Sequence, residues 1–226
     1  MKKIIVNTSF DFVTEKINEF GFDTIPVIKS DRVSAPISAH ADVLYNKLSD
    51  NEIILSACQK ANLPQIIESG YKCTVYDKLL PGYKTECGLN FVINNEVVLK
   101  NPKTAADIDA GDKKVITVKQ GYTRCSVLEI TDNVYITDDE GIYSKLTENL
   151  LNCLLVKKGI VQLDGYDYGF IGGATINMKN GKILFCGDIE NTEEKYNIEK
   201  FLFEYSKEAV FIKGKTLTDI GSGIVL

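Results

Sequence analysis

The sequence predicts a single α/β domain, residues 1–226, in which five strand-strand-helix-strand units form a ring. Four segments share one hairpin pattern, and each is followed by a helix-like stretch and another apolar strand. The two chain ends supply the parts of a fifth unit. A repeat of roughly 40 to 50 residues is typical of radial folds. We therefore expect a five-fold pseudosymmetric α/β-propeller.

The hairpin pattern is a small or polar opening, an apolar strand, a turn and a second apolar strand. It occurs at residues 38–55, 82–99, 121–136 and 169–185. The turns contain Asp50-Asn51, Asn94-Asn95, Asp132-Asn133 and Asn180-Gly181. These residue types tolerate the positive φ angles that tight hairpins require.

A helix and a third strand are expected after each hairpin. The expected helices are residues 63–69, 102–110, 141–152 and 192–207, and the strands are 73–76, 115–118, 153–156 and 209–212. The last helix has the clearest pattern, because apolar residues recur at helical spacing behind Thr192, a residue type that caps helix N-termini.

The fifth unit is divided between the chain ends. Residues 218–226 match the first strand of a hairpin, and the N-terminal part supplies a strand at 3–6, a helix at 13–20 and a strand at 24–28. Pairing of the N- and C-terminal strands would close the ring and leave few exposed strand edges.

Composition argues against several classes of function. The net charge of -5 disfavours a nucleic-acid partner, because that affinity depends on Lys and Arg. No apolar run approaches the roughly 18 residues of a membrane helix, and the N-terminal apolar run is too short for a signal peptide. Six scattered cysteines and one histidine favour reduced thiols and no metal site. We therefore expect a cytoplasmic protein that needs neither metal nor organic cofactor.

Candidate site residues lie at the openings of the hairpins. In a ring these openings should face one central funnel, and ligand sites favour such concave places. The residues are His40, Asp42, Glu86, Cys87, Arg124, Cys125, Gly172, Gly173, Asp219 and Ser222. The set contains thiols, carboxylates and the only histidine, which are the groups that nucleophilic and acid–base chemistry uses.

The ring and its motifs resemble the pentein superfamily, the guanidino-group-modifying enzymes, which includes arginine deiminases, dimethylarginine hydrolases, agmatine deiminases and amidinotransferases. His40-Ala41-Asp42 is similar to their His-x-Asp motif, and Gly-Tyr-Thr-Arg-Cys at 121–125 is similar to the segment that carries their nucleophile. Segments 121–126, 169–173 and 219–222 look like an uncharacterised bacterial branch of this superfamily.

The resemblance implies hydrolysis or transfer at a C–N bond of a guanidine or amidine. Cys125 would attack the central carbon, and His40 would protonate the departing amine and later activate water. Asp42 and Asp219 would hold the guanidinium, although Asp42 could instead orient the imidazole. Arg124 would favour the thiolate of Cys125 but would repel a cationic substrate if it faced the funnel.

The remaining candidates are assigned to substrate binding, and each has a structural alternative. Cys87 is the rival nucleophile, although buried cysteines are commonly inert packing. Glu86 could simply pair with Arg124. Gly172 and Gly173 could serve only backbone geometry, and Asp42 and Asp219 could cap turns.

Two other functions stay open. The main alternative is a non-catalytic ring protein that binds a small molecule or a protein. A propeller that binds carbohydrate or nucleotide is less favoured, because the chain has no tryptophan and we expect no stacking aromatics at the funnel. The expected partners are a small-molecule ligand, such as a guanidino compound, and as a further option a second copy of the chain.

Overall fold

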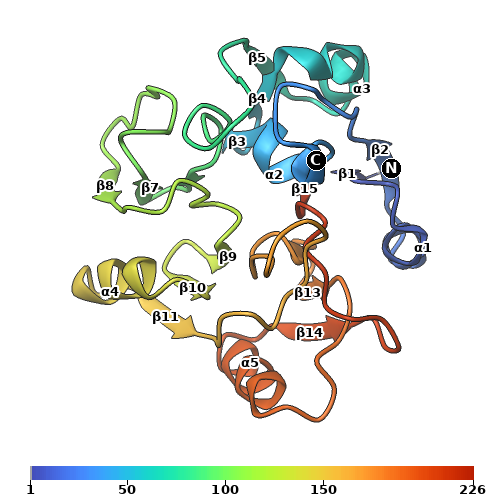
Figure 1. Ribbon diagram of the computed structural model, residues 1–226, viewed down its shortest axis with the longest axis vertical. Helices are drawn as coiled ribbons and strands as arrows, with labels where there is room; N and C mark the ends of the chain where they lie inside the picture. The colour runs from blue at the N-terminus through green and yellow to red at the C-terminus, as the bar shows by residue number, and fades with distance from the viewer. Residues whose placement is uncertain (1) are drawn as a thin grey trace.

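The computed structural model describes residues 2–226, which form five three-stranded sheets connected by helices and loops (Figure 1). In every sheet the first two strands are antiparallel and the third runs parallel to the second. The sheets are β15 (Gly223–Val225), β1 (Lys3–Val6) and β2 (Asp23–Pro26); β3 (Tyr45–Ser49), β4 (Glu52–Ser56) and β5 (Lys72–Tyr76); β6 (Val92–Ile93), β7 (Val97–Lys100) and β8 (Lys114–Thr117); β9 (Val127–Thr131), β10 (Val134–Thr137) and β11 (Asn152–Leu155); and β12 (Thr175–Asn177), β13 (Lys182–Phe185) and β14 (Glu208–Phe211).

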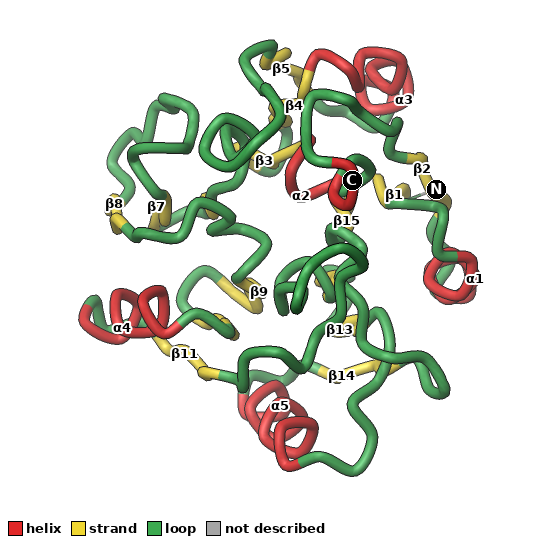
Figure 2. Tube along the Cα trace, in the orientation of Figure 1, coloured by secondary structure: helices red, strands yellow, loops and turns green. Residues whose placement is uncertain are grey.

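Four of the helices connect the second and third strands of a unit: α1 (Asp11–Glu19), α3 (Leu63–Glu68), α4 (Glu140–Glu148) and α5 (Glu193–Glu204). Figure 2 shows these helices at the periphery, whereas α2 (Ala41–Leu44) lies near the middle of the view. Thr192 caps α5, as the sequence predicted, by accepting a hydrogen bond from Lys195 N at 3.2 Å. Two 3₁₀ segments, η1 (Ala35–Ile37) and η2 (Ala57–Asn62), complete the elements. Among residues 2–226, no helix is long and apolar enough to span a membrane.

The strands at the two ends of the described chain pair with each other, as the sequence predicted. Ile4, Ile5 and Val6 of β1 lie opposite Val225, Ile224 and Gly223 of β15 in antiparallel register. Leu226 N also donates to Lys3 O at 2.9 Å. This pairing completes the fifth sheet and places the loop before β15 beside the start of α2.

The helix expected at residues 102–110 is absent, and that expectation was wrong. The Asn101 carbonyl accepts from Thr104 N and Ala105 N at 3.2 and 3.0 Å, which makes only one turn. Ala106 N then donates to Gly88 O at 2.7 Å. Because this amide is bonded to a distant carbonyl, it cannot bond the carbonyl four residues earlier, and the chain continues as a loop.

Buried asparagine amides connect neighbouring sheets. Asn46 Nδ2 on β3 donates to Leu89 O at 2.8 Å and to Phe91 O at 2.7 Å. Asn177 Nδ2 on β12 donates to Glu129 O and Ile130 O at 3.0 and 3.2 Å. Each amide therefore joins its own unit to two backbone carbonyls of the neighbouring unit.

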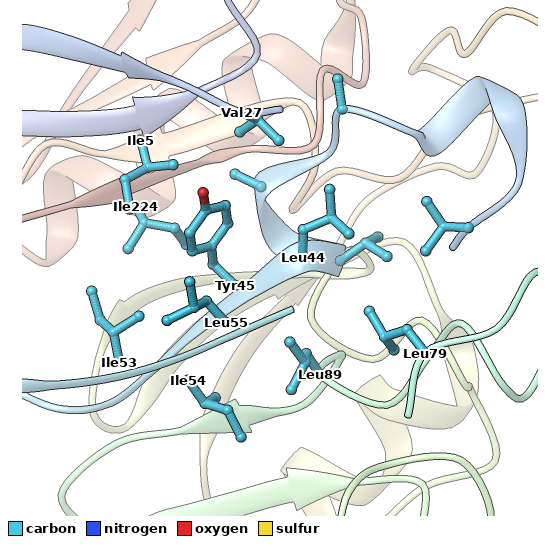
Figure 3. Packing of buried hydrophobic residues seen from close by; sticks show 14 of the residues in the cluster. Ile5, Val27, Leu44, Tyr45, Ile53, Ile54, Leu55, Leu79, Leu89 and Ile224 are labelled. Carbon is cyan, nitrogen blue, oxygen red and sulfur yellow. The ribbon is translucent and has the colours of Figure 1, made fainter. Parts of the chain in front are cut away.

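The largest buried cluster surrounds Tyr45, between the sheet of β1 and the sheet of β3 (Figure 3). Its phenol is fully buried and donates to Gln59 Oε1 while accepting from Asn62 Nδ2, both at 2.8 Å. Ile5 and Ile224 belong to the same cluster, so the pairing of the two terminal strands also contributes to the core.

We expect Asn46→Ala to lower the free energy of unfolding by about 2–4 kcal/mol, because the Phe91 carbonyl would lose its side-chain donor and Arg124 Nη1 would lose its acceptor. Chemical denaturation followed by circular dichroism measures the loss. Asn95→Ala is the matched control: its exposed amide bonds only Asp132 Oδ2, and its effect should stay within about 0.5 kcal/mol. Equal losses in the two variants would contradict this account of sheet-to-sheet contact.

Candidate active site

The structure brings together the four residues to which the sequence assigned chemistry. His40 Nδ1 lies 3.6 Å from Asp219 Oδ1 and 3.9 Å from Asp42 Oδ1. The Cys125 thiol is near enough to both carboxylates for their charges to raise its pKa. Residues from the two ends and the middle of the chain therefore share one buried cluster.

Asp219 and the glycines around it hold the histidine in place. Asp219 Oδ1 accepts from Gly221 N and Oδ2 accepts from Phe170 N, both at 3.0 Å. Gly221 has a φ of 81°, and a Cβ there would lie 2.3 Å from His40 Cα. Only glycine satisfies both the backbone conformation and this close approach.

Asn90 positions the cysteine and was missed in the sequence. Its Oδ1 accepts from Arg124 N and Cys125 N at 2.7 and 3.2 Å, and its Nδ2 donates to Cys125 Sγ at 2.9 Å. Nδ2 also donates to Asp42 O at 3.1 Å. The one available signal was a polar residue within the apolar run 89–93.

The cluster is enclosed, which corrects the expectation that its members line an open funnel. His40, Cys125 and Asp219 are each 2% exposed and Asp42 is 0% exposed. Segment 29–39, which precedes His40, contributes Val33, Ile37 and Ala39 to the same apolar cluster as Cys125. His40, Asp42, Cys125 and Asp219 thus face inward, and residues of segment 29–39 pack in the same apolar cluster as Cys125.

A separate cavity of about 200 Å³ opens among the hairpin turns. Of the expected funnel residues, it is lined by Arg124, Gly172 and Ser222. Arg124 Nη1 donates to Asn46 Oδ1 at 3.0 Å, and its buried Nε has no partner. Arg124 therefore lines this cavity while Cys125, the next residue, belongs to the enclosed cluster.

Glu86 and Cys87 lie outside the cluster. Glu86 Oε2 accepts from Ser34 N and Ser34 Oγ, both at 2.7 Å, and Oε1 accepts from the Tyr122 hydroxyl. The alternative in which Glu86 pairs with Arg124 does not hold, because the Glu86 carboxylate bonds Ser34 of segment 29–39 and Tyr122. Burial raises the pKa of Cys87 to about 12, so this thiol is a poor nucleophile in the present structure.

The small residues shape the backbone. A Cβ on Gly172 would lie 2.5 to 2.6 Å from three carbonyl oxygens, including that of Cys125. A Cβ on Gly173 would lie 2.1 Å from Asp219 Oδ1, and Gly173 N donates to Cys125 O at 2.9 Å. Ser222 Oγ donates to Thr175 O at 2.7 Å. Each contact fits a structural role.

The electrostatics of the cluster favour a cation. Both carboxylate oxygens of Asp42 and Nδ1 of His40 are buried without a hydrogen-bond partner. Burial raises the pKa of Asp219 to about 6, against the opposing effect of His40. Burial, Asp42 and Asp219 together raise the pKa of Cys125 well above its usual value. The expectation that Arg124 would favour the thiolate is therefore wrong for this enclosed state, because the carboxylates dominate the surroundings of the thiol.

Across residues 2–226, no group of three or more His, Cys, Asp and Glu side chains is arranged to hold a metal ion. The cluster consists of a thiol, an imidazole and two carboxylates. His40 Nδ1 and both oxygens of Asp42 have no hydrogen-bond partner in it. These groups can bind a planar cation, supply a nucleophile and exchange protons.

Solved structures with the same architecture share little sequence with the chain. SxtG, an amidinotransferase from Microseira wollei in the saxitoxin biosynthetic pathway, matches with a TM-score of 0.58 and 9% identity over 95% of this chain and 77% of that chain. Dimethylarginine dimethylaminohydrolase, as its adduct with 4-chloro-2-hydroxymethylpyridine, matches with a TM-score of 0.54 and 10% identity over 94% and 92%. The fold is that of the pentein superfamily, as the sequence resemblance implied.

A family model places the chain more narrowly. It matches residues 4–224, and the chain belongs to this family of unknown function, DUF6873. A search of the curated proteins found no match.

We expect Gly173→Ala to displace Asp219 from His40, because the added Cβ would overlap Asp219 Oδ1. The NMR signals of His40, the only histidine, should shift, and stability should fall by about 1–3 kcal/mol. Gly181→Ala is the control, because its φ of 90° also strains alanine but its surroundings are open. The control should lose about 1 kcal/mol without moving the histidine signals; displaced histidine signals in that variant would contradict the local explanation.

Glu86→Gln should weaken the attachment of segment 29–39 in a pH-dependent way. Burial alone would raise the pKa of Glu86, but hydrogen bonds from Tyr122, Ser34 and Gly82 outweigh it, and the net pKa is lowered. The native glutamate therefore stabilises the fold above its unfolded pKa, and this contribution is lost as pH falls through the lower folded value. Urea unfolding should give a higher free energy of unfolding for the native protein than for Glu86→Gln at pH 7, and this difference should shrink as the pH is lowered. A difference that stays constant with pH would contradict the stabilising role of the ionised Glu86.

Proposed function

We propose that this protein modifies a C–N bond of a guanidine or amidine through a covalent intermediate on Cys125. In this proposal the five sheets act as a closed α/β-propeller, and its central cluster binds a small molecule. The observation that carries the proposal is the carboxylate of Asp42, which is fully buried, unpartnered and grouped with His40 and Cys125. The fold shared with an amidinotransferase and a dimethylarginine hydrolase supports the same reaction class.

A buried carboxylate without a partner is costly, so its working state should include a cation. A guanidinium is flat and carries N–H donors along its edges, which match the oxygens of Asp42 and Asp219. Arg124 bonds Asn46 and lines the separate cavity, so its charge is directed away from a cation bound at Asp42.

The bound cation would also prepare the nucleophile. In the enclosed state, Asp42 and Asp219 oppose ionisation of Cys125. A guanidinium between these groups would offset their charge and lower the pKa of the thiol. Activation would then follow substrate binding, and the empty site would stay unreactive.

The reaction proceeds in two balanced stages. Cys125 gives its proton to solvent by way of the neighbouring Asp219, Sγ bonds the central carbon, and the C–N bond breaks as a protonated His40 gives its proton to the departing amine. His40 then takes a proton from water or from an acceptor amine, which attacks the same carbon. The S–C bond breaks, the thiol regains a proton, and a urea-type or transferred-amidine product leaves. Asp42 and Asp219 orient the carbon throughout.

Entry to the cluster would require movement of segment 29–39. Ser34 is the point at which this segment bonds Glu86, and Ile37 packs in the same apolar cluster as Cys125. The bonds to Glu86 would hold the segment closed over bound substrate and exclude water from the covalent intermediate.

A non-catalytic binding protein is the second candidate, and one observation favours it. Every member of the cluster is at most 2% exposed, and the pKa of Cys125 is raised, so the resting thiol is protected and protonated. In that case the cluster would bind a cation without covalent chemistry.

Alkylation by 2-chloroacetamidine separates the two candidates, because this cation carries an electrophilic carbon into an anionic site. We expect it to label Cys125 at least about tenfold faster than neutral 2-chloroacetamide, a preference of about 1.4 kcal/mol. Peptide mass spectrometry with time locates the adduct.

Cys125→Ala should abolish the rapid labelling, Cys73→Ala should retain it, and Asp42→Asn should remove the preference for the cation. Release of amine or ammonia from a panel of guanidines then identifies the reaction. Equal, slow labelling of all six cysteines would support the binding protein.

A further inference from the structure

Asp138, which directly follows β10, is a buried carboxylate that the proposed chemistry does not use. It is 5% exposed, and its Oδ2 accepts from Ile171 N at 3.1 Å. Its Oδ1 is buried without a hydrogen-bond partner. Asp138 also lines a cavity on the outside of the molecule, together with residues 139–141 and 155–158.

The backbone places Asp138 beside Asp219. Two consecutive amides hold the two side chains: Phe170 N donates to Asp219 Oδ2 and Ile171 N donates to Asp138 Oδ2. The other oxygen of Asp219 lies 3.6 Å from His40 Nδ1. A sequence of ionisable groups therefore runs from the outer cavity through Asp138 and Asp219 to His40.

The pKa values of both carboxyls are raised toward neutrality. Burial is the main cause that raises the pKa of Asp138 to about 7, and the charges of Asp219 and Asp139 add to it. Burial likewise raises the pKa of Asp219 to about 6, with His40 lowering it and Asp42 raising it. On the cavity side the facing charges are Asp139, Glu140, Lys157 and Lys158.

We propose that Asp138 and Asp219 form a proton relay between the His40–Cys125 cluster and the outer cavity. This inference rests on the proposed function, which requires a proton to leave an enclosed site. When the cation enters, the thiol proton of Cys125 passes to Asp219, from Asp219 to Asp138 and from Asp138 to solvent, and Sγ then bonds carbon. One positive charge enters and one leaves, so the buried site keeps its net charge. In hydrolysis, the attacking water gives one proton to His40 and one to the thiol, so the relay carries one proton outward in each turnover.

The first test needs no substrate. The side-chain carboxyl signal of Asp219 can be followed with pH by NMR. Asp138→Asn keeps an acceptor for Ile171 N and removes the charge, so the titration midpoint of Asp219 should fall by about 0.3 to 1 pH unit. Glu140→Gln removes a charge from the same cavity outside the relay and should shift the midpoint by less than about 0.1 unit. Identical midpoints in the wild type and Asp138→Asn would overturn the relay.

If Asp138→Asn does not fold, the relay can be tested on the native protein by following the carboxyl signals of Asp138 and Asp219 with pH by NMR. Coupled groups titrate together in two steps, so Asp138 and Asp219 should each show two inflections at shared pH values. Independent single inflections would overturn the relay.

The second test uses proton release. Binding of methylguanidinium, measured by calorimetry in two buffers of different ionisation enthalpy near pH 7, should release close to one proton from the wild type. Asp138→Asn should release fewer and should slow 2-chloroacetamidine labelling of Cys125 by about tenfold, whereas Glu140→Gln should change neither result. Binding without proton release would overturn the relay while leaving the proposed function intact. A shifted Asp219 midpoint without any methylguanidinium binding would support the proton path and count against the guanidine chemistry.

Discussion

The antiparallel pairing of β1 with β15 is the constraint on which the site depends. It fixes the segment just before β15, and this segment carries both Asp219 and Gly221. Gly221 contacts His40 so closely that no side chain fits between them, and Gly221 O accepts from Asp42 N at 2.9 Å. The same pairing that completes the fifth sheet therefore holds the imidazole between two carboxylates.

Enclosure and electrostatics reinforce each other in this cluster. Water at a surface would screen the charges of Asp42 and Asp219. Inside the protein the effective dielectric constant is low, so these two carboxylates strongly oppose formation of the Cys125 thiolate. In the proposed mechanism, such a site is unreactive when empty and gains a nucleophile only when a cation enters. Selectivity would thus come from charge, because a neutral isostere cannot offset the carboxylates.

Repeated local patterns made much of the fold predictable from the sequence. Asn- and Gly-rich turns located the four complete hairpins, and the matching ends indicated how the fifth sheet is formed. The grouping of His40, Asp42, Cys125 and Asp219 followed from their places in the repeat. The loop at 102–110 was not predictable, because its decisive bond goes to Gly88 O, which the local pattern does not reveal.

What the repeat cannot reveal is whatever belongs to one unit alone. Segment 29–39 connects two units, and nothing in the repeated pattern indicated that its residues pack in the same apolar cluster as Cys125. Asn90 and Asp138 act through partners far away in the chain, and each resembles an ordinary polar residue until those partners are known. The candidate site therefore arises where the repeated pattern is broken: the pattern brings the openings together, and departures from it supply the amide that holds the thiol and the carboxyl next to the outer cavity. The enclosed cluster takes its imidazole and one acid from the opening at residues 40–42, its thiol from residue 125 and its second acid from residue 219.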